Sequence, residues 1–254
     1  MSRTLLAGIA AFLLLTGFAT SAAPTASDRL AMGLPASGEL RGELVELQDG
    51  AAGFLAILQP RQRGKARGGV ILLHDRGTSA NSLEVIRPLR LGLAEAGWDT
   101  LSLRLSLAGG GQADEATVVA RLRSGLDWLK SREPSRLVVI ALGDSAAAAL
   151  AYASQGPPPE LRALVLISAA DDPQTPGSTE SPLAQVRLPV LDVYAERDHR
   201  AVLDAVARRR GVASGNPEIS YAQGPIVGAS GGFFGVEDGL LSRIRGWLAS
   251  RPEG

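Results

Sequence analysis

The chain has 254 residues, of which 45% are hydrophobic and 20% are charged, a composition typical of a folded globular protein rather than a disordered one. Lys plus Arg and Asp plus Glu each number 26, so no bulk charge favours nucleic acid or an anionic membrane surface as a partner. Cysteine is absent, which excludes a disulfide framework and an N-terminal lipoprotein thiol.

Residues 1–23 have the pattern of a secretory signal peptide. Arg3 precedes an apolar run from Leu5 to Phe18, and small residues follow as far as Ala23. A permanent anchor is the alternative interpretation, but the run is shorter than the ~20 apolar residues that span a bilayer. We expect cleavage after Ala22 or Ala23, a periplasmic or secreted mature protein without a membrane span, and a flexible lead over residues 24–39.

Residues 40–250 predict a single α/β domain. Two strand-like stretches, residues 40–47 and 53–58, flank Asp49 and Gly50, which indicates an antiparallel hairpin. Short continuous apolar runs follow, as expected for parallel strands that are covered on both faces by helices. These runs span residues 68–74, 98–105, 136–142, 161–168 and 188–195.

Amphipathic stretches lie between the apolar runs and predict crossover helices, over residues 87–96, 114–132, 145–154 and 200–211. In the second of these, Asp114 is placed to act as the N-cap residue. A last strand is expected over residues 218–227, before a closing helix. The pattern predicts one doubly wound, mostly parallel sheet with an N-terminal antiparallel hairpin.

Three turns that follow predicted parallel strands carry reactive side chains, and open sheets form their sites at such turns. The first is Gly143-Asp144-Ser145-Ala146-Ala147, between a strand and a helix. A serine flanked by small residues at such a bend is typical of the nucleophile elbow of hydrolases. We therefore predict Ser145 as a nucleophile and Ala146 as part of its oxyanion pocket. The alternative is that Ser145 caps its helix.

The second turn, His74-Asp75-Arg76-Gly77, follows the first parallel strand. In hydrolases this turn supplies a backbone N–H to the oxyanion hole, so we place His74, Arg76 and Gly77 beside the pocket. His74 has a second interpretation, in which it packs at the strand end and orders the turn by hydrogen bonding.

The third turn contains Asp198 and His199, after the strand over residues 188–195. An acid here fits the chain order Ser, then Asp, then His, in which the acid orients the catalytic imidazole. Capping of the next helix is an equally good role for Asp198. His199 would have to reach over Ser145 to act as its base.

The stretches VIRPLRLGLAEAGWDTLSLRL, PVLDVYAERD and LLSRIRGWL, together with the order of elements and the three turns, resemble the uncharacterised bacterial family DUF3530 of the α/β-hydrolase superfamily. The resemblance extends from about Arg41 to Leu248. It implies the hydrolase fold and an exported bacterial protein, and it implies no substrate.

One departure from the family pattern bears on activity. Typical members carry a histidine after the last strand in a pattern like G-A-x-H-x-F, whereas this chain has Gly228-Ala229-Ser230-Gly231-Gly232-Phe233. Gly231 thus stands at the position of the base, and the only histidines are His74 and His199. A serine hydroxyl without a base in reach is a poor nucleophile.

We therefore expect an exported, catalytically degenerate protein that binds a ligand or a partner. The alternative is a weak or non-standard periplasmic serine esterase that uses Ser145 on a small ester-like or lipid-like molecule. No metal is expected, because Asp171-Asp172 has no histidine nearby, and no cofactor is expected, because the triple glycine 109–111 fails the dinucleotide template at Asp114.

Overall fold

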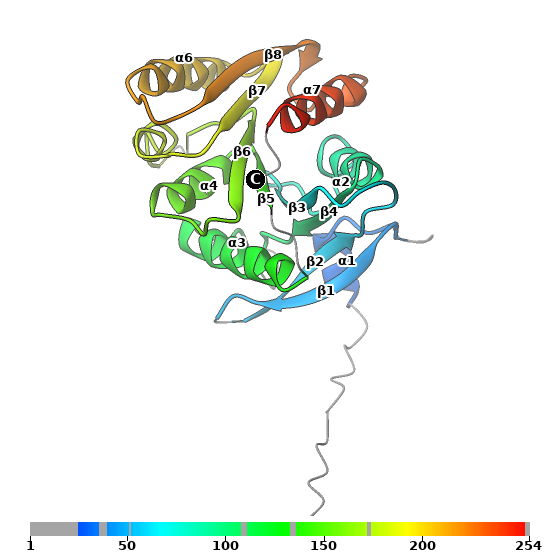
Figure 1. Cartoon of the computed structure of the whole chain (residues 1–254). Helices are drawn as coiled ribbons and strands as arrows, with labels where there is room; N and C mark the ends of the chain where they lie inside the picture. The colour runs from blue at the N-terminus through cyan, green and yellow to red at the C-terminus, as the bar shows by residue number, and fades with distance from the viewer. Residues whose placement is uncertain are drawn as a thin grey trace, which may run out of the picture.

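The computed structural model describes residues 25–35, 40–50, 52–107, 111–132, 136–171 and 174–251, and the predicted signal peptide lies outside them. Within these residues, eight strands form one sheet in the order β1-β2-β4-β3-β5-β6-β7-β8 (Figure 1). The strands are β1 Glu43–Gln48, β2 Gly53–Gln59, β3 Gly68–Leu73, β4 Trp98–Leu103, β5 Leu137–Leu142, β6 Leu161–Ile167, β7 Val190–Arg197 and β8 Tyr221–Ser230.

The pairing of the strands confirms the predicted sheet. β2 runs antiparallel to both β1 and β4, and every other pair, from β4 and β3 through to β7 and β8, is parallel. The carboxyl ends of β3, β5, β6 and β7 therefore meet at one edge of the sheet, where sites form in open α/β proteins.

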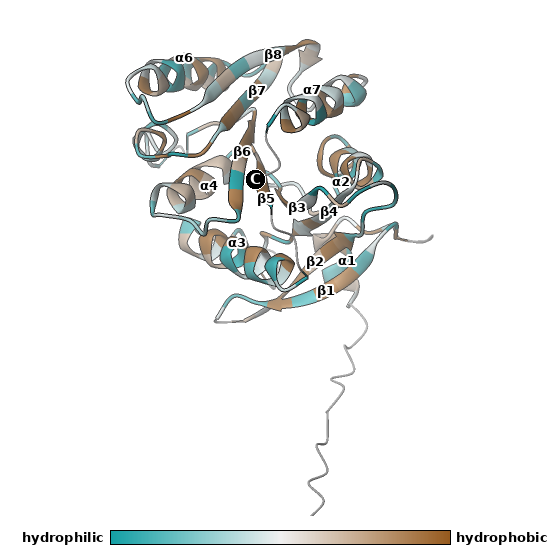
Figure 2. Cartoon of the chain, viewed as in Figure 1, coloured by the Kyte–Doolittle hydropathy of each residue, from teal (hydrophilic) through white to brown (hydrophobic). Residues whose placement is uncertain are grey.

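Helices cover both faces of the sheet. They are α1 Ala26–Ala31, α2 Ile86–Glu95, α3 Glu115–Lys130, α4 Ser145–Ser154, α5 Glu180–Leu183, α6 Arg200–Ser214 and α7 Glu237–Ala249. Residues of α3 and α4 pack on one face and residues of α2 and α7 on the other. Figure 2 shows the hydrophobic strands between these two layers. None of the helices in the described part of the chain is long and apolar enough to cross a membrane.

The central strands β3, β5 and β6 are buried on both faces because alternate side chains enter opposite cores. Along β3, Val70 and Leu72 pack with α2 and α7, whereas Ile71 and Leu73 pack with α3 and α4. A strand between two helix layers needs apolar residues at every position, which is why the sequence shows continuous apolar runs there.

The N-terminal hairpin is tied to α3 by a buried ion pair. The Asp49 carboxylate accepts a hydrogen bond from the Ala52 N–H (2.8 Å) and pairs with Arg121 of α3 at 3.1 Å. The Arg121 guanidinium also lies 4.9 Å from the centre of the Phe54 ring. These contacts fix the hairpin, predicted from Asp49 and Gly50, against the core.

Two elements differ from the prediction. The lead over residues 24–39 contains α1, whose N-terminus is held by a capping box between Thr25 and Asp28, and Asp28 pairs with Arg104 at 2.7 Å. The last strand spans Tyr221–Ser230 rather than residues 218–227, because it follows β7 as far as the pairing of Arg197 with Ser230. Gly231 therefore comes directly after β8.

Candidate active site at the carboxyl ends of the strands

The bend between β5 and α4 has its strained residue at Gly143. Its φ is +62°, a conformation that favours glycine, and a Cβ at this position would lie 2.1 Å from Cγ of Asp75. In a nucleophile elbow the serine itself occupies the strained turn between strand and helix. The structure places Ser145 two residues beyond that position, as the first residue of α4. The strained position of the bend is therefore occupied by Gly143, whereas the sequence pattern placed Ser145 there.

The Ser145 side chain is turned back toward the strand ends. The residue is 5% exposed, and its hydroxyl donates to the Leu142 carbonyl (2.9 Å) and faces the Leu73 carbonyl at 3.3 Å. The alternative role as a helix cap is also wrong, because Asp144 is the N-cap residue of α4 and no side chain caps it. Ser145 instead links the ends of β5 and β3.

The Asp75 carboxylate fills the space above Gly143. Its Oδ1 accepts hydrogen bonds from the backbone N–H of Arg76 (2.9 Å) and from the backbone N–H of Asp144 (3.0 Å). The Arg76 side chain in turn pairs with Asp144 through Nε and Oδ2 at 2.6 Å. One carboxylate oxygen thus bridges the turn after β3 and the turn after β5.

These two N–H groups are in the places where a hydrolase binds its oxyanion. The hole combines the N–H of the residue after the nucleophile with an N–H from the loop after β3. With Gly143 at the nucleophile position, these donors are the N–H groups of Asp144 and Arg76. Both donate to Asp75, and the Arg76 N–H also donates to Oδ1 of Asp144 at 3.0 Å. The Ala146 N–H, predicted for this role, donates to the Gly143 carbonyl at 3.3 Å instead. Gly77 has φ +76° and allows the backbone to turn after β3.

The environment of Asp75 disfavours its charged form. Burial raises the pKa of Asp75 to about 6, and the neighbouring carboxylate of Asp144 adds to this effect, although the backbone N–H groups of Asp144 and Arg76 oppose it. A carboxylate that is partly desolvated beside a second carboxylate keeps its proton at higher pH than usual. The raised pKa of Asp75 thus reflects its burial and its position beside the Asp144 carboxylate.

His74 uses both ring nitrogens within the structure. Its Nδ1 lies 2.9 Å from the Asp75 carbonyl, which can only accept, so Nδ1 carries the proton, and Nε2 accepts from the Leu105 N–H at 3.0 Å. Burial lowers the pKa of His74, so the neutral form is favoured. These contacts are those of a residue that orders the turn after β3.

Asp198 and His199 lie at the end of β7. The Asp198 carboxylate accepts from the Ser168 hydroxyl, from the Ala195 N–H (3.0 Å) and from the His199 N–H (2.9 Å). Asp198 does not cap α6, because the N-cap residue is His199. Within the part of the chain that the structure describes, no hydrogen bond joins Asp198 or His199 to Ser145.

The His199 ring occupies the space beside Gly231. A Cβ on Gly231 would lie 3.3 Å from Nε2 of His199 and 3.9 Å from a carboxylate oxygen of Asp198. The imidazole next to the acid thus comes from the residue after Asp198 rather than from the loop after β8.

The cavity at Ser145 is small. Its volume is about 50 Å³, and His74, Asp75, Arg76, Asp144 and Ser145 are among its lining residues, whereas Asp198 and His199 are not. Pockets that hold organic ligands measure roughly 300–1,000 Å³. The space beside Ser145 is therefore too small for an ester substrate in this conformation.

Sequence reasoning missed Gly143 and Asp75. The sequence signal for Gly143 is the same elbow motif placed two residues earlier in the chain. In that position Gly143 is the central residue, and Ala141 and Ser145 are the small residues on either side of it. Asp75 carries no such signal, because its role depends on the meeting of two turns that are distant in the chain.

The sequence matches the model of a family described as "Protein of unknown function (DUF3530)" over residues 16–110 and 107–250. No curated protein matches the chain.

Solved structures with the same fold include three hydrolase-related proteins. A dienelactone hydrolase from Anabaena variabilis superposes with a TM-score of 0.68 at 20% identity, over 83% of this chain and 98% of the other. The esterase domain of a Rhodothermus marinus protein gives 0.63 at 16% identity, over 81% and 96%. A serine hydrolase homologue from Coxiella burnetii gives 0.62 at 16% identity, over 84% and 98%. At these identities the likeness shows the α/β-hydrolase fold alone.

Proposed function

Because the chain belongs to the DUF3530 family and has an α/β-hydrolase fold, we propose that it is a catalytically inactive member of that fold which acts by binding a ligand or a partner. The N-terminal sequence pattern supports an exported protein, in the periplasm or outside the cell.

The observation that carries this proposal is the hydrogen bonding of Asp75. An oxyanion hole stabilises the charge that develops on a substrate oxygen, so its two donors must be open to that oxygen. Here the N–H groups of Arg76 and Asp144 already bind the Asp75 carboxylate, and the N–H of Arg76 also binds the Asp144 carboxylate. A substrate carbonyl would have to displace a charged group to reach them.

Two further observations support the loss of activity. The strained position of the bend is a glycine, which has no side chain to attack a substrate. Ser145 lies nearby, but its hydroxyl proton is bound by a backbone carbonyl, and no histidine is in hydrogen-bond contact with it among the described residues.

The experiment that tests the proposal is an assay on a panel of short-chain and medium-chain esters. It compares the wild type with a Gly231→His/His199→Ala double variant, in which the second change makes room for the new ring. We expect neither protein to hydrolyse the esters above the uncatalysed rate, because the strained position still lacks a nucleophile. Hydrolysis by the wild type that is lost in Ser145→Ala would instead support the esterase alternative.

A further inference from the structure

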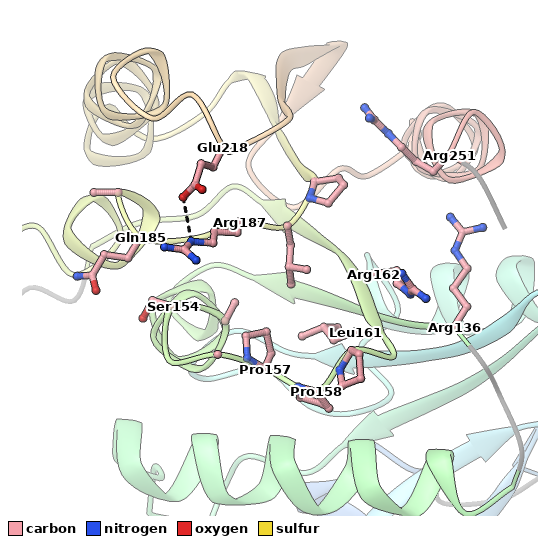
Figure 3. A pocket seen from close by; sticks show the side chains of 16 residues that line it. Arg136, Ser154, Pro157, Pro158, Leu161, Arg162, Gln185, Arg187, Glu218 and Arg251 are labelled. Carbon is pink, nitrogen blue, oxygen red and sulfur yellow. Dashed lines mark ion pairs between the residues drawn. The ribbon is translucent and has the colours of Figure 1, made fainter. Parts of the chain in front are cut away.

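A second cavity lies at the opposite edge of the sheet, where the parallel strands begin (Figure 3). Arg136 directly precedes β5, Arg162 is the second residue of β6, and Pro189 directly precedes β7. The cavity measures about 1030 Å³, at the upper end of the range for ligand pockets, roughly 300–1,000 Å³. None of the site residues at the carboxyl ends of the strands lines it. This cavity is therefore separate from the one beside Ser145, and ligand binding in it does not depend on whether Ser145 reacts.

Much of the wall of this cavity is apolar and stiff. Three consecutive prolines follow α4, and a fourth precedes β7; proline fixes its backbone φ, so this part of the wall changes little when a ligand binds. The apolar lining residues are Ala153, Pro157, Pro158, Pro159, Leu161, Ala184, Leu188 and Pro189. Such a wall suits an aliphatic chain or a ring.

The charged side chains of the cavity are mostly cationic. Four arginines and one glutamate line it. Arg187 pairs with Glu218 at 2.9 Å, and both side chains are largely exposed, so this pair is weak. In Figure 3, Arg136, Arg162 and Arg251 lie on the other side of the cavity from this pair. The cavity therefore combines an apolar wall with an excess of positive charge.

Two of these arginines have donors left for a ligand. Among the described residues, Arg162 forms no hydrogen bond or ion pair, and its charge acts on Glu160, a carboxylate that is already paired with Lys130 at 2.7 Å. Arg251 donates from Nη1 to the Ser220 hydroxyl (2.9 Å), and its guanidinium lies 4.7 Å from the centre of the Trp247 ring, while its Nη2 forms no hydrogen bond among the described residues. A bound anion can accept charge-assisted hydrogen bonds from these guanidinium donors.

We propose that this cavity binds an amphipathic organic anion, a carboxylate or a phosphate ester joined to an apolar chain or ring. The anionic group binds Arg162 and Arg251, and the apolar part packs on the proline wall. The guanidinium fork of arginine matches the oxygen geometry of either anion.

Isothermal titration calorimetry with octanoate, octyl phosphate, 1-octanol and inorganic phosphate tests this proposal. We expect one or both octyl anions to bind at least about tenfold more tightly than 1-octanol or inorganic phosphate, and Arg162→Ala to weaken their binding by about tenfold or more. The tighter of the two octyl anions identifies the head group. Arg123→Ala, which removes an exposed arginine of α3 outside this cavity, is the matched control and should bind as the wild type does.

A second variant, Gln185→Trp, places a bulky side chain at an exposed lining position and should reduce octyl-anion binding without a change in thermal stability. The proposal is overturned if the octyl anions bind no better than 1-octanol. It is equally overturned if folded Arg162→Ala and Gln185→Trp both keep the wild-type affinity.

Discussion

Gly143 and Asp75 share one small volume at the bend between β5 and α4. The glycine has φ +62°, and the missing Cβ leaves the space in which the Asp75 carboxylate sits and binds two backbone N–H groups. A serine in the strained position would have to displace that carboxylate. At the scale of single residues, the proposed loss of activity therefore depends on this pair.

Substitution of Gly143→Ala should lower the free energy of unfolding by about 3 kcal/mol, because it adds both backbone strain and an overlap with Asp75. The matched control is Gly156→Ala, at φ +76° with open space around its Cβ, which should cost only about 1 kcal/mol. Urea unfolding of both variants measures the difference.

In an Asp75→Ala background, the cost of Gly143→Ala should fall toward that of Gly156→Ala, because the overlapping atoms are gone. Equal losses for Gly143→Ala and Gly156→Ala in the wild-type background would contradict the placement of Asp75 over Gly143.

The raised pKa of Asp75 predicts a pH dependence of stability. The folded protein holds this proton up to about pH 6, whereas an unfolded aspartate releases it near pH 4. The folded state therefore binds more protons in this window, and the contribution of Asp75 to the free energy of unfolding falls as the pH rises from about 4 to about 6.

Asp75→Asn should remove this fall and raise the free energy of unfolding at pH 8 by about 1–2 kcal/mol, since the amide oxygen can still accept from both N–H groups. Denaturant unfolding of the variant and the wild type at pH 4, 6 and 8 measures the effect. A variant that is less stable at pH 8 and keeps the wild-type slope would show that Asp75 is not the group responsible.

At the scale of elements, hydrophobic periodicity predicted most of the fold. The runs in β3 and β5 are apolar at every position because helices cover both faces of the sheet there. The helical spacing of Val118, Leu122, Leu126 and Leu129 gives α3 the apolar side that packs on one of these faces. Asp114 is the N-cap of α3, and its side chain accepts from the Thr117 N–H at 2.8 Å, as the pattern predicted. The six-residue α1 was not predicted, because none of its residues is buried and fewer than two helical turns carry little periodic signal.

The candidate site was only partly predictable. The order of strands placed Arg76, Ser145 and Asp198 after the correct strands, because turn positions follow from the element pattern. The central residue of the bend could not be predicted, because the sequence fits the elbow motif with either Gly143 or Ser145 at its centre. Only the backbone conformation distinguishes the two. The contact between Asp75 and Gly143 is a tertiary one, which a single sequence does not record.

A buried charge cluster joins α6 to β7 and β8. Arg209 forms a bidentate pair with Asp192, at 2.8 and 3.2 Å, and both side chains are fully buried. The Asp192 carboxylate also accepts from the Tyr221 hydroxyl (2.5 Å), and burial raises the pKa of this tyrosine, with a further contribution from the Asp192 charge. The cluster fixes α6, which follows the turn that carries Asp198.

Arg209→Ala should therefore lower the free energy of unfolding by about 3–5 kcal/mol, since it leaves the Asp192 charge buried without its cation. Arg200→Ala is the control, because it breaks the exposed i,i+4 pair with Asp204 on the same helix and should cost less than about 0.5 kcal/mol. Thermal and urea unfolding provide the measurement, and similar losses for the two variants would mean that the buried pair does not hold α6.

For the molecule as a whole, the two ends of the parallel strands differ in the size of the cavity beside them. At the carboxyl ends of the strands, Asp75 fills the space above Gly143, and the cavity beside Ser145 measures about 50 Å³. At the amino ends, a cavity of about 1030 Å³ is lined by arginines and prolines. The larger of these two cavities thus lies at the opposite edge of the sheet from the candidate site.

The most direct test of the central claim is labelling with a fluorophosphonate probe, which reacts with activated serines. The folded protein should show no adduct by intact-mass spectrometry after an incubation that fully labels an active serine esterase added to the same sample. An adduct that maps to Ser145 and disappears in Ser145→Ala would contradict the account, because it would show that this hydroxyl is activated despite the bound carboxylate and the absent base.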